Sequence, residues 1–154
     1  MSNRTQPNDN FRLGCLYVVA FAQAVAPHVG LIIPLDTDSG ALVHIRVDRA
    51  TSPHWQYQNP TTPIPRAPHA HSTYILVLRA AAEAEPAPAN DKFGECAPWV
   101  WQVIQRLLGQ GNLSLMSGAD IPALAAEFDT FVSGNRAFAT RTHFSNCAVS
   151  QISS

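Results

Sequence analysis

The pattern of apolar and polar positions predicts several β-strands in the first half of the chain. Residues 16–22 are apolar at both odd and even positions, so both faces of a strand would be apolar, and the segment is rich in β-forming residues. This is typical of a central strand covered on both faces. Residues 28–35 and 41–48 flank a run of turn-forming residues at 36–40, so they predict an antiparallel hairpin. Residues 72–79 show the next strongest strand pattern, and we expect them to lie beside another inner strand.

The two faces of the predicted hairpin differ in chemistry. A period of two places His28 and His44 on the same face. A loop centred near Asp38 would pair His44 with Ile32, whereas a loop that opens at Pro34 would bring the two histidines closer. This pattern fits a functional pair and equally fits two ordinary half-exposed histidines. The opposite face is apolar and consists of Val29, Leu31, Ile33, Val43, Ile45 and Val47.

Two later segments have the periodicity of amphipathic helices. The first starts at Cys96, has Pro98 in its first turn and ends at Gly109, where a helix C-terminus favours a positive φ. The second follows Asp120 as N-cap and stops at residues 134–135. Their apolar stripes are Val100, Val103, Ile104 and Leu107, and Ile121, Leu124, Phe128 and Phe131. The pattern therefore predicts an α+β fold in which an antiparallel β-sheet packs against two main helices.

The remaining segments are predicted connections. Residues 51–58 hold Trp55 and Tyr57 in a short aromatic piece, which fits either a third strand or an arm over a pocket. Residues 60–68 are rich in proline and predict an extended, semi-rigid loop. Residues 80–90 are rich in Ala, Glu and Pro and predict a surface linker, with or without one helical turn, that leads to the first helix.

The composition favours one intracellular domain. A chain of 154 residues with 46% hydrophobic content supports one core, and we expect a disordered segment at 1–11, a single α+β domain at 12–138 and a loosely packed C-terminal segment at 139–154. No stretch resembles a signal peptide or reaches the length of a membrane span, which predicts a cytoplasmic protein. A net charge of −1 argues against nucleic acid as a partner, and the oligomeric state is left open.

Candidate metal ligands are few. The odd number of cysteines, without metal-type spacing, predicts reduced thiols rather than disulfides or a metal centre. His69 and His71 are spaced to chelate a metal from a strand, but no acidic residue or cysteine lies at a helpful spacing. We therefore expect those two histidines to be solvent-exposed, and we predict neither a metal nor a cofactor.

Cys96 has two opposed interpretations. At a helix start, unpaired backbone N–H groups and the positive end of the helix dipole favour a thiolate, which is the environment of a nucleophilic cysteine. The same position also suits a small buried residue, because cysteine is among the residue types most often buried. The segment by itself does not choose between them.

The order of these elements resembles the circularly permuted papain-like arrangement. In the lecithin:retinol acyltransferase-like thiol acyltransferases and phospholipases, a histidine strand and a second histidine precede a cysteine helix, and residues 28–32, His44 and residues 95–100 are similar to those motifs. The chain also resembles a group of small fungal proteins of unassigned function. That resemblance rests mainly on short motifs at residues 16–18, 28–33, 44, 55–57, 76–79, 96–100 and 121–132.

The resemblance implies a thiol-dependent hydrolase or acyltransferase that acts on a small soluble acyl, thioester or amide substrate. In that role Cys96 would be the nucleophile, His28 would take its proton, and His44 would orient the His28 imidazole. Arg46, which lies on the same face of the predicted strand as His44, could bind a substrate carboxylate. The residues expected to bind substrate are Trp55, Tyr57, Trp99 and Arg46.

Two other functions are compatible with the same residues. One is a biosynthetic cyclase or isomerase of fungal specialised metabolism, in which His28, His44 or Cys96 acts as acid and base. The other is a non-catalytic binding module on the same scaffold. Glu95 points toward the binding module, because a carboxylate directed at the neighbouring thiol opposes thiolate formation.

Overall fold

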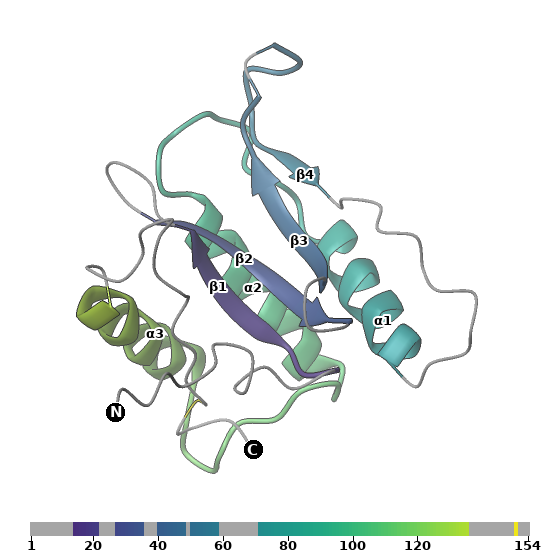
Figure 1. Ribbon diagram of the computed structural model, residues 1–154, viewed down its shortest axis with the longest axis vertical. Helices are drawn as coiled ribbons and strands as arrows, with labels where there is room; N and C mark the ends of the chain where they lie inside the picture. Colours follow the sequence, from purple (N-terminus) through teal and green to yellow (C-terminus); the bar gives the residue numbers. More distant parts are fainter. Residues whose placement is uncertain are drawn as a thin grey trace, which may run out of the picture.

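The described residues form an α+β fold with one four-stranded sheet and three helices (Figure 1). The computed structural model describes residues 14–21, 27–35, 40–48, 50–58, 71–135 and 150. The elements are β1 (Tyr17–Phe21), β2 (His28–Pro34), β3 (Gly40–Arg46), β4 (Gln56–Gln58), α1 (His71–Ala84), α2 (Cys96–Gly109) and α3 (Ile121–Asn135). The predicted segments at 1–11 and 60–68 lie outside the described residues, as do His69 and, apart from residue 150, the predicted segment at 139–154.

The sheet is an antiparallel meander in the order β1-β2-β3-β4. The predicted hairpin is confirmed as β2 and β3, which pair Leu31 with Val43 and Pro34 with Gly40. The aromatic piece at 51–58 contributes the strand β4, so the third-strand alternative is the one that forms.

The expectation of a central strand at residues 16–22 is wrong. β1 pairs only with β2 among the described strands and lies at one edge of the sheet. Its two last residues, Ala20 and Phe21, are exposed. A continuous apolar run predicts burial on both faces, but burial of an edge strand depends on the elements that cover it, and the sequence pattern does not contain them.

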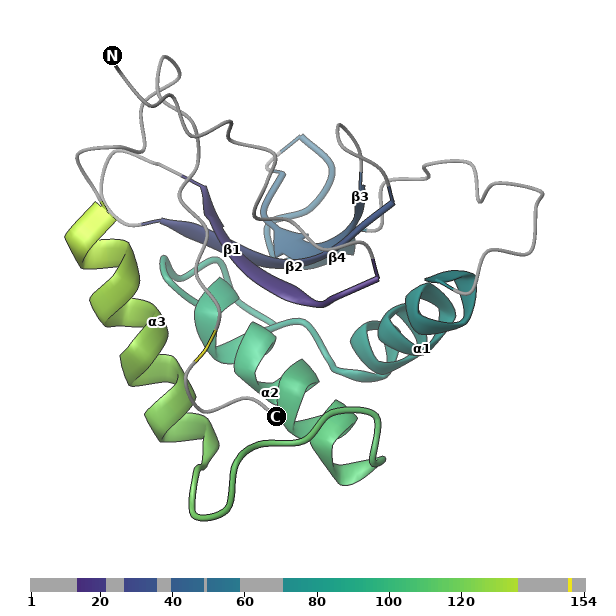
Figure 2. The same cartoon turned by 60° about the horizontal axis from the view of Figure 1, so that its bottom comes forward.

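The three helices lie on the same side of the sheet, with α2 beneath the strands and α1 and α3 to either side (Figure 2). The face of β2 and β3 that meets α2 is the apolar one, as the alternation predicted. Leu31, Val43, Ile45 and Val100 are fully buried there. Each such side chain contributes on the order of 1.5–3 kcal/mol relative to exposure, so this layer holds the hairpin on α2.

Residues 72–79 were predicted as a strand, and this prediction is wrong, since they belong to α1. The helix continues through residues 80–84, which were expected to be linker, so the described chain has three helices rather than two. A short apolar run without clear periodicity fits a buried strand or a buried helix, and the alanines that follow it extend the segment to helix length. The buried positions Ile75, Leu78, Ala81 and Ala82 have helical spacing.

The other two helices agree closely with the predicted ones. α2 begins at Cys96 and ends at Gly109, although the positive φ of 74° occurs at Gly111 rather than at Gly109. The Asp120 carboxylate accepts a hydrogen bond from the Ala123 N–H at 2.9 Å, as expected of an N-cap. No helix in the described ranges is long and apolar enough to cross a membrane.

Candidate functional site

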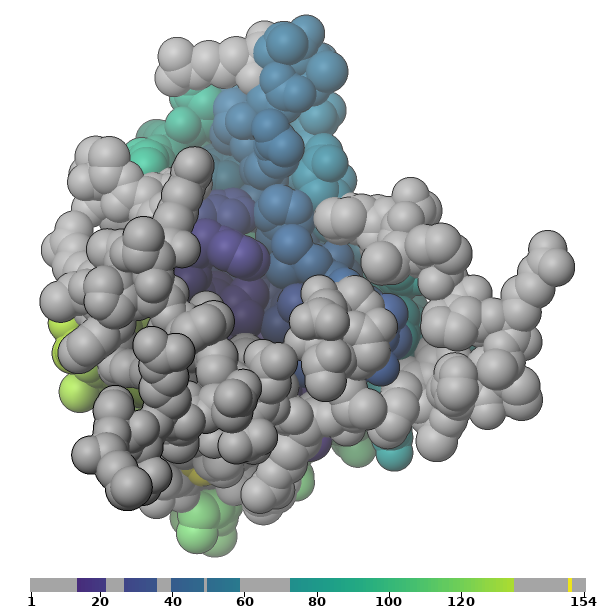
Figure 3. Space-filling model, in the orientation of Figure 1, coloured from purple at the N-terminus to yellow at the C-terminus, as the bar shows by residue number. Residues whose placement is uncertain are grey.

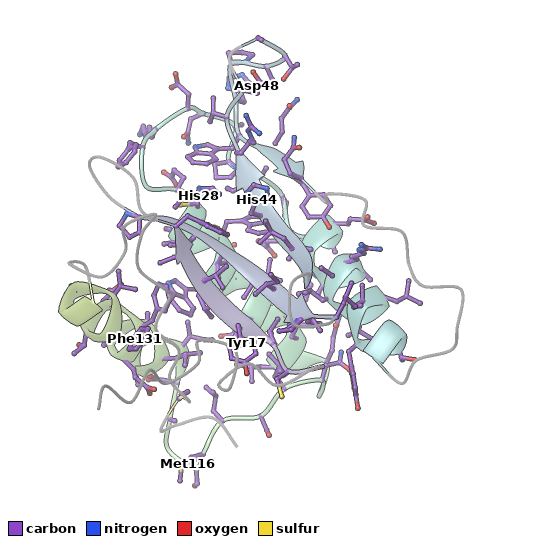
Figure 4. The ribbon with its side chains drawn as sticks, in the orientation of Figure 1. Tyr17, His28, His44, Asp48, Met116 and Phe131 are labelled. Atoms are coloured by element: carbon purple, nitrogen blue, oxygen red, sulfur yellow. The ribbon has the colours of Figure 1, made fainter. Side chains whose placement is uncertain are left out.

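His28 and His44 are joined directly on the face of the sheet that points away from the helices (Figure 4). His28 Nε2 lies 2.7 Å from His44 Nδ1, and the two rings meet edge to face with centroids 5.0 Å apart and an interplanar angle of 76°. Both side chains are half-buried. A nitrogen-to-nitrogen distance of this length requires a shared hydrogen, so one imidazole donates and the other accepts.

The register of the hairpin and a glycine make this contact possible. Continuing the β2–β3 pairing from Leu31 and Val43 places Gly30 opposite His44. A Cβ atom at Gly30 would lie only 3.2 Å from the His44 Cβ and 3.2 Å from a Leu42 methyl. The space above Gly30 is therefore used by His44, whose ring reaches diagonally across the hairpin to His28.

We expect Gly30→Ala to disturb the pair without unfolding the chain. The added methyl would lie 3.2 Å from the His44 Cβ, a Leu42 methyl and the Val43 carbonyl oxygen, so these atoms must move by a few tenths of an ångström. We expect the movement of His44 to lengthen its hydrogen bond to His28. The expected stability cost is about 1–3 kcal/mol. Urea unfolding and the histidine ring signals in NMR measure the two effects. Unchanged His28 and His44 signals in Gly30→Ala would contradict the positioning role.

Both imidazoles are neutral at pH 7. Burial lowers the pKa of His28, and the nearby Arg46 charge lowers it further. Burial, His28 and Arg46, in that order, lower the pKa of His44 to about 4. Because both pKa values lie below the ordinary histidine value of about 6.5, both rings are mainly neutral at pH 7.

A neutral pair of this kind presents one acid and one base to a ligand. If His28 Nε2–H donates to His44 Nδ1, then the outer nitrogen of His28 is an acceptor and the outer nitrogen of His44 carries a hydrogen. If the shared hydrogen resides on His44 Nδ1 instead, the two outer roles are exchanged. The pair therefore offers one donor and one acceptor in either tautomer.

Cys96 lies on the other side of the sheet from this pair. It exposes 4% of its surface and belongs to the apolar layer between α2 and the sheet, together with Val100 and Leu107 on the same helical stripe. Among the described residues its thiol makes no hydrogen bond to His28 or His44. The structure thus brings the two predicted histidines together and does not bring the predicted nucleophile to them.

We expect iodoacetamide to distinguish the thiols of this chain. Cys15 is exposed and should react at the rate of a fully accessible thiol. Cys96 should react at least about 100-fold more slowly, because iodoacetamide can reach it only when the core opens locally. The experiment uses a Cys147→Ser variant, since Cys147 lies outside the described residues. Equal labelling of both thiols in the folded protein would show that Cys96 is accessible.

The two tryptophans that were expected to bind substrate form hydrogen bonds with the connection between α1 and α2. The Trp55 indole N–H donates to the Lys92 carbonyl at 3.0 Å, and the Trp99 indole N–H donates to the Glu85 carbonyl at 3.2 Å. Trp99 exposes 2% of its surface and lies on the helix side of the sheet. These contacts occupy the polar atoms of both indoles.

Tyr57 also points to the helix side, where its ring lies 6.1 Å from that of Trp99. Burial is the main cause that raises its pKa to about 12, with a contribution from Glu83 that Arg79 opposes. Its hydroxyl is buried and has no hydrogen-bond partner in the described part of the chain. The phenol therefore stays protonated, and it does not belong to the histidine face.

Arg46 is the predicted binding residue that does lie beside the histidines. It is exposed, follows His44 on the same face of β3, and lowers the pKa of both imidazoles through its charge. In the part of the chain that the structure describes, it forms no ion pair. The proximity of a fixed positive charge favours ligands with a negative charge at this face.

Other possible sites are weaker. The described residues contain no cluster of three or more His, Cys, Asp or Glu side chains that could hold a metal ion. A shallow depression on the helix side is lined by Glu85, Gln102, Gln105 and Arg106, but Glu85 and Arg106 pair with each other at 3.0 Å. The depression therefore offers no free charge from these two residues.

Sequence reasoning did not single out Phe21 or Gly30. Phe21 pairs with His28 across β1 and β2, and their ring centroids lie 6.0 Å apart. A glycine inside an apolar strand is a signal of close approach, and this signal would have identified Gly30. Comparison with protein-family models, curated proteins and solved structures found no match for this chain.

Proposed function

We propose that the protein is a small acid–base enzyme of the isomerase type, in which His28 and His44 move a proton between two positions of a small carbonyl compound. The observation that carries this proposal is the 2.7 Å contact between the two imidazoles on the face away from the core. Neutral imidazoles are suited to proton transfer near pH 7, because each can accept a proton and each can release one.

The transfer follows from the two tautomers. With the shared hydrogen on His28 Nε2, the free nitrogen Nδ1 of His28 takes a proton from the carbon next to a substrate carbonyl, and the C–H electron pair forms the enolate. His28 then passes its Nε2 hydrogen to His44 Nδ1, and His44 releases its Nε2 hydrogen to the enolate oxygen or to another carbon. The pair ends as the opposite tautomer with the same number of protons, and exchange with water resets it.

The proposal assigns Cys96 a structural role. Its position in the apolar layer beneath the sheet supports this assignment, since the imidazoles lie on the opposite face. The choice corresponds to the acid–base interpretation of the sequence, in which activity does not require the thiol.

A second candidate is a thiol-dependent hydrolase or acyltransferase on a permuted papain-like fold. It is favoured by one observation, which is that Cys96 is the first residue of α2 and follows the histidine-bearing hairpin in the chain. This candidate requires the Cys96 thiol to reach His28, so it predicts a reactive thiol in the folded protein.

The test is exchange of carbon-bound hydrogen in D2O. Phenylpyruvate and phenylacetone, one anionic and one neutral, both carry acidic hydrogens next to a carbonyl, and NMR follows their replacement by deuterium. The proposal predicts exchange of at least one compound above the rate measured with a His28→Gln/His44→Gln double variant. Exchange of neither compound above that background would sink the proposal.

A further inference from the structure

The histidine face carries a row of four side chains that crosses the whole sheet. The register pairs Phe21 with His28 and Arg46 with Gln56, and continuing the β2–β3 pairing places His28 next to Arg46. The residues of the row are thus Phe21, His28, Arg46 and Gln56. Since neighbouring strands are about 4.8 Å apart, the backbones at Phe21 and Arg46 are about 10 Å apart, and His28 lies between them.

One end of the row is apolar and aromatic. Phe21 exposes 43% of its surface although it is a large apolar residue, and its ring is tilted by 30° relative to the His28 ring. β1 reaches the surface on this side of the molecule (Figure 3). An exposed ring beside a half-buried imidazole offers a surface on which a flat apolar group can stack.

The other end of the row is positively charged and rich in donors. None of the four strands contains an aspartate or a glutamate, so Arg46 has no carboxylate on its own face of the described sheet. The side-chain carbonyl oxygen of Gln56 accepts a hydrogen bond from the Thr51 hydroxyl at 3.5 Å, so the amide hydrogens of Gln56 remain as donors. Gln58 lies opposite His44 in the register and adds a second amide.

We propose that this face binds a small carboxylic acid that bears a flat apolar group. Its carboxylate contacts Arg46, its apolar group lies against Phe21, and the carbon between them is held over His28. A guanidinium fork matches the geometry of a carboxylate, and the separation of the two ends suits a molecule of about 10 Å. The inference rests on the proposed function only in placing the reactive carbon at the histidine pair.

The test measures binding without chemistry. Phenylacetate, which has the carboxylate and the ring but no ketone, is titrated into the wild type while NMR follows the His28 and His44 ring signals. Phenylacetamide is the matched neutral probe, and Arg46→Gln is the matched variant. We expect saturable shifts with phenylacetate, and affinity at least about tenfold weaker both for phenylacetamide and for the Arg46→Gln variant.

The possible outcomes separate this inference from the proposed function. Equal binding of the acid and the amide, unchanged affinity in Arg46→Gln, or no saturable shift with either probe would each overturn the inference. Any of these results leaves the deuterium exchange of phenylacetone as an independent measure of the histidine pair. Conversely, binding of phenylacetate without exchange of either phenylpyruvate or phenylacetone would keep the carboxylate site and remove the proton transfer.

Discussion

Replacing His44 by glutamine is expected to lower the rate of deuterium exchange by about 100- to 10,000-fold, which is the usual contribution of a positioned acid or base. The amide cannot relay a proton, so the link between His28 Nε2 and His44 Nδ1 is lost. His28→Gln should have an effect of the same size. The double variant should be no worse than either single variant, because the two rings act as one unit.

Cys96→Ala is the matched control for the histidine variants. Its side chain lies in the apolar layer and touches no polar group of the pair, so the rate should stay within about threefold of the wild type once folding is verified. A deuterium-exchange rate that falls in Cys96→Ala but is unchanged in His44→Gln would contradict the structural role of Cys96 and favour the thiol-dependent candidate.

The stability of the protein is expected to fall between pH 7.5 and pH 5 because of the same pair. The pKa of His28 and that of His44 lie below the ordinary value in the folded chain, so the unfolded chain binds more protons in this range. The stabilising contribution is complete above about pH 6.5 and is lost as the pH falls toward the folded pKa of His44 at about 4. Allowing for solvent screening at half-buried rings, we expect a loss of about 1–2 kcal/mol.

Urea unfolding at the two pH values measures this loss, and the range stays above the pKa of ordinary carboxyl groups. The His28→Gln/His44→Gln variant should lose most of the dependence, and Arg46→Gln should reduce it, because the Arg46 charge lowers the pKa of both rings. A wild-type stability that does not change from pH 7.5 to pH 5 would show that the rings titrate as freely as in the unfolded chain.

The sequence predicted the hairpin and two of the helices because their apolar periods are clear. Val29, Leu31 and Ile33 alternate along β2, and Val100, Val103 and Leu107 recur along α2. α1 was missed because residues 74–78 are apolar at every position, so neither period stands out. The edge position of β1 depends on which strands pair, and a single segment does not encode its neighbours.

The separation of Cys96 from the histidines could have been derived from the same periods. Helical spacing puts Cys96 on the stripe of Val100 and Val103, which faces the apolar side of the hairpin. A period of two puts His28 and His44 on the other side of that hairpin. What the sequence could not supply is the direct contact, because it depends on a register fixed where Pro34 pairs with Gly40 and on the space above Gly30.

The proposed proton transfer requires that His28 and His44 share one hydrogen while both are neutral at pH 7. Nitrogen-15 NMR of the imidazole rings measures it most directly, since the nitrogen shifts distinguish protonated, neutral donor and neutral acceptor atoms. We predict one donor and one acceptor nitrogen at the His28–His44 contact at pH 7.5, with His44 charging only near pH 4. Two independent titrations near the ordinary histidine pKa of about 6.5 would contradict the account.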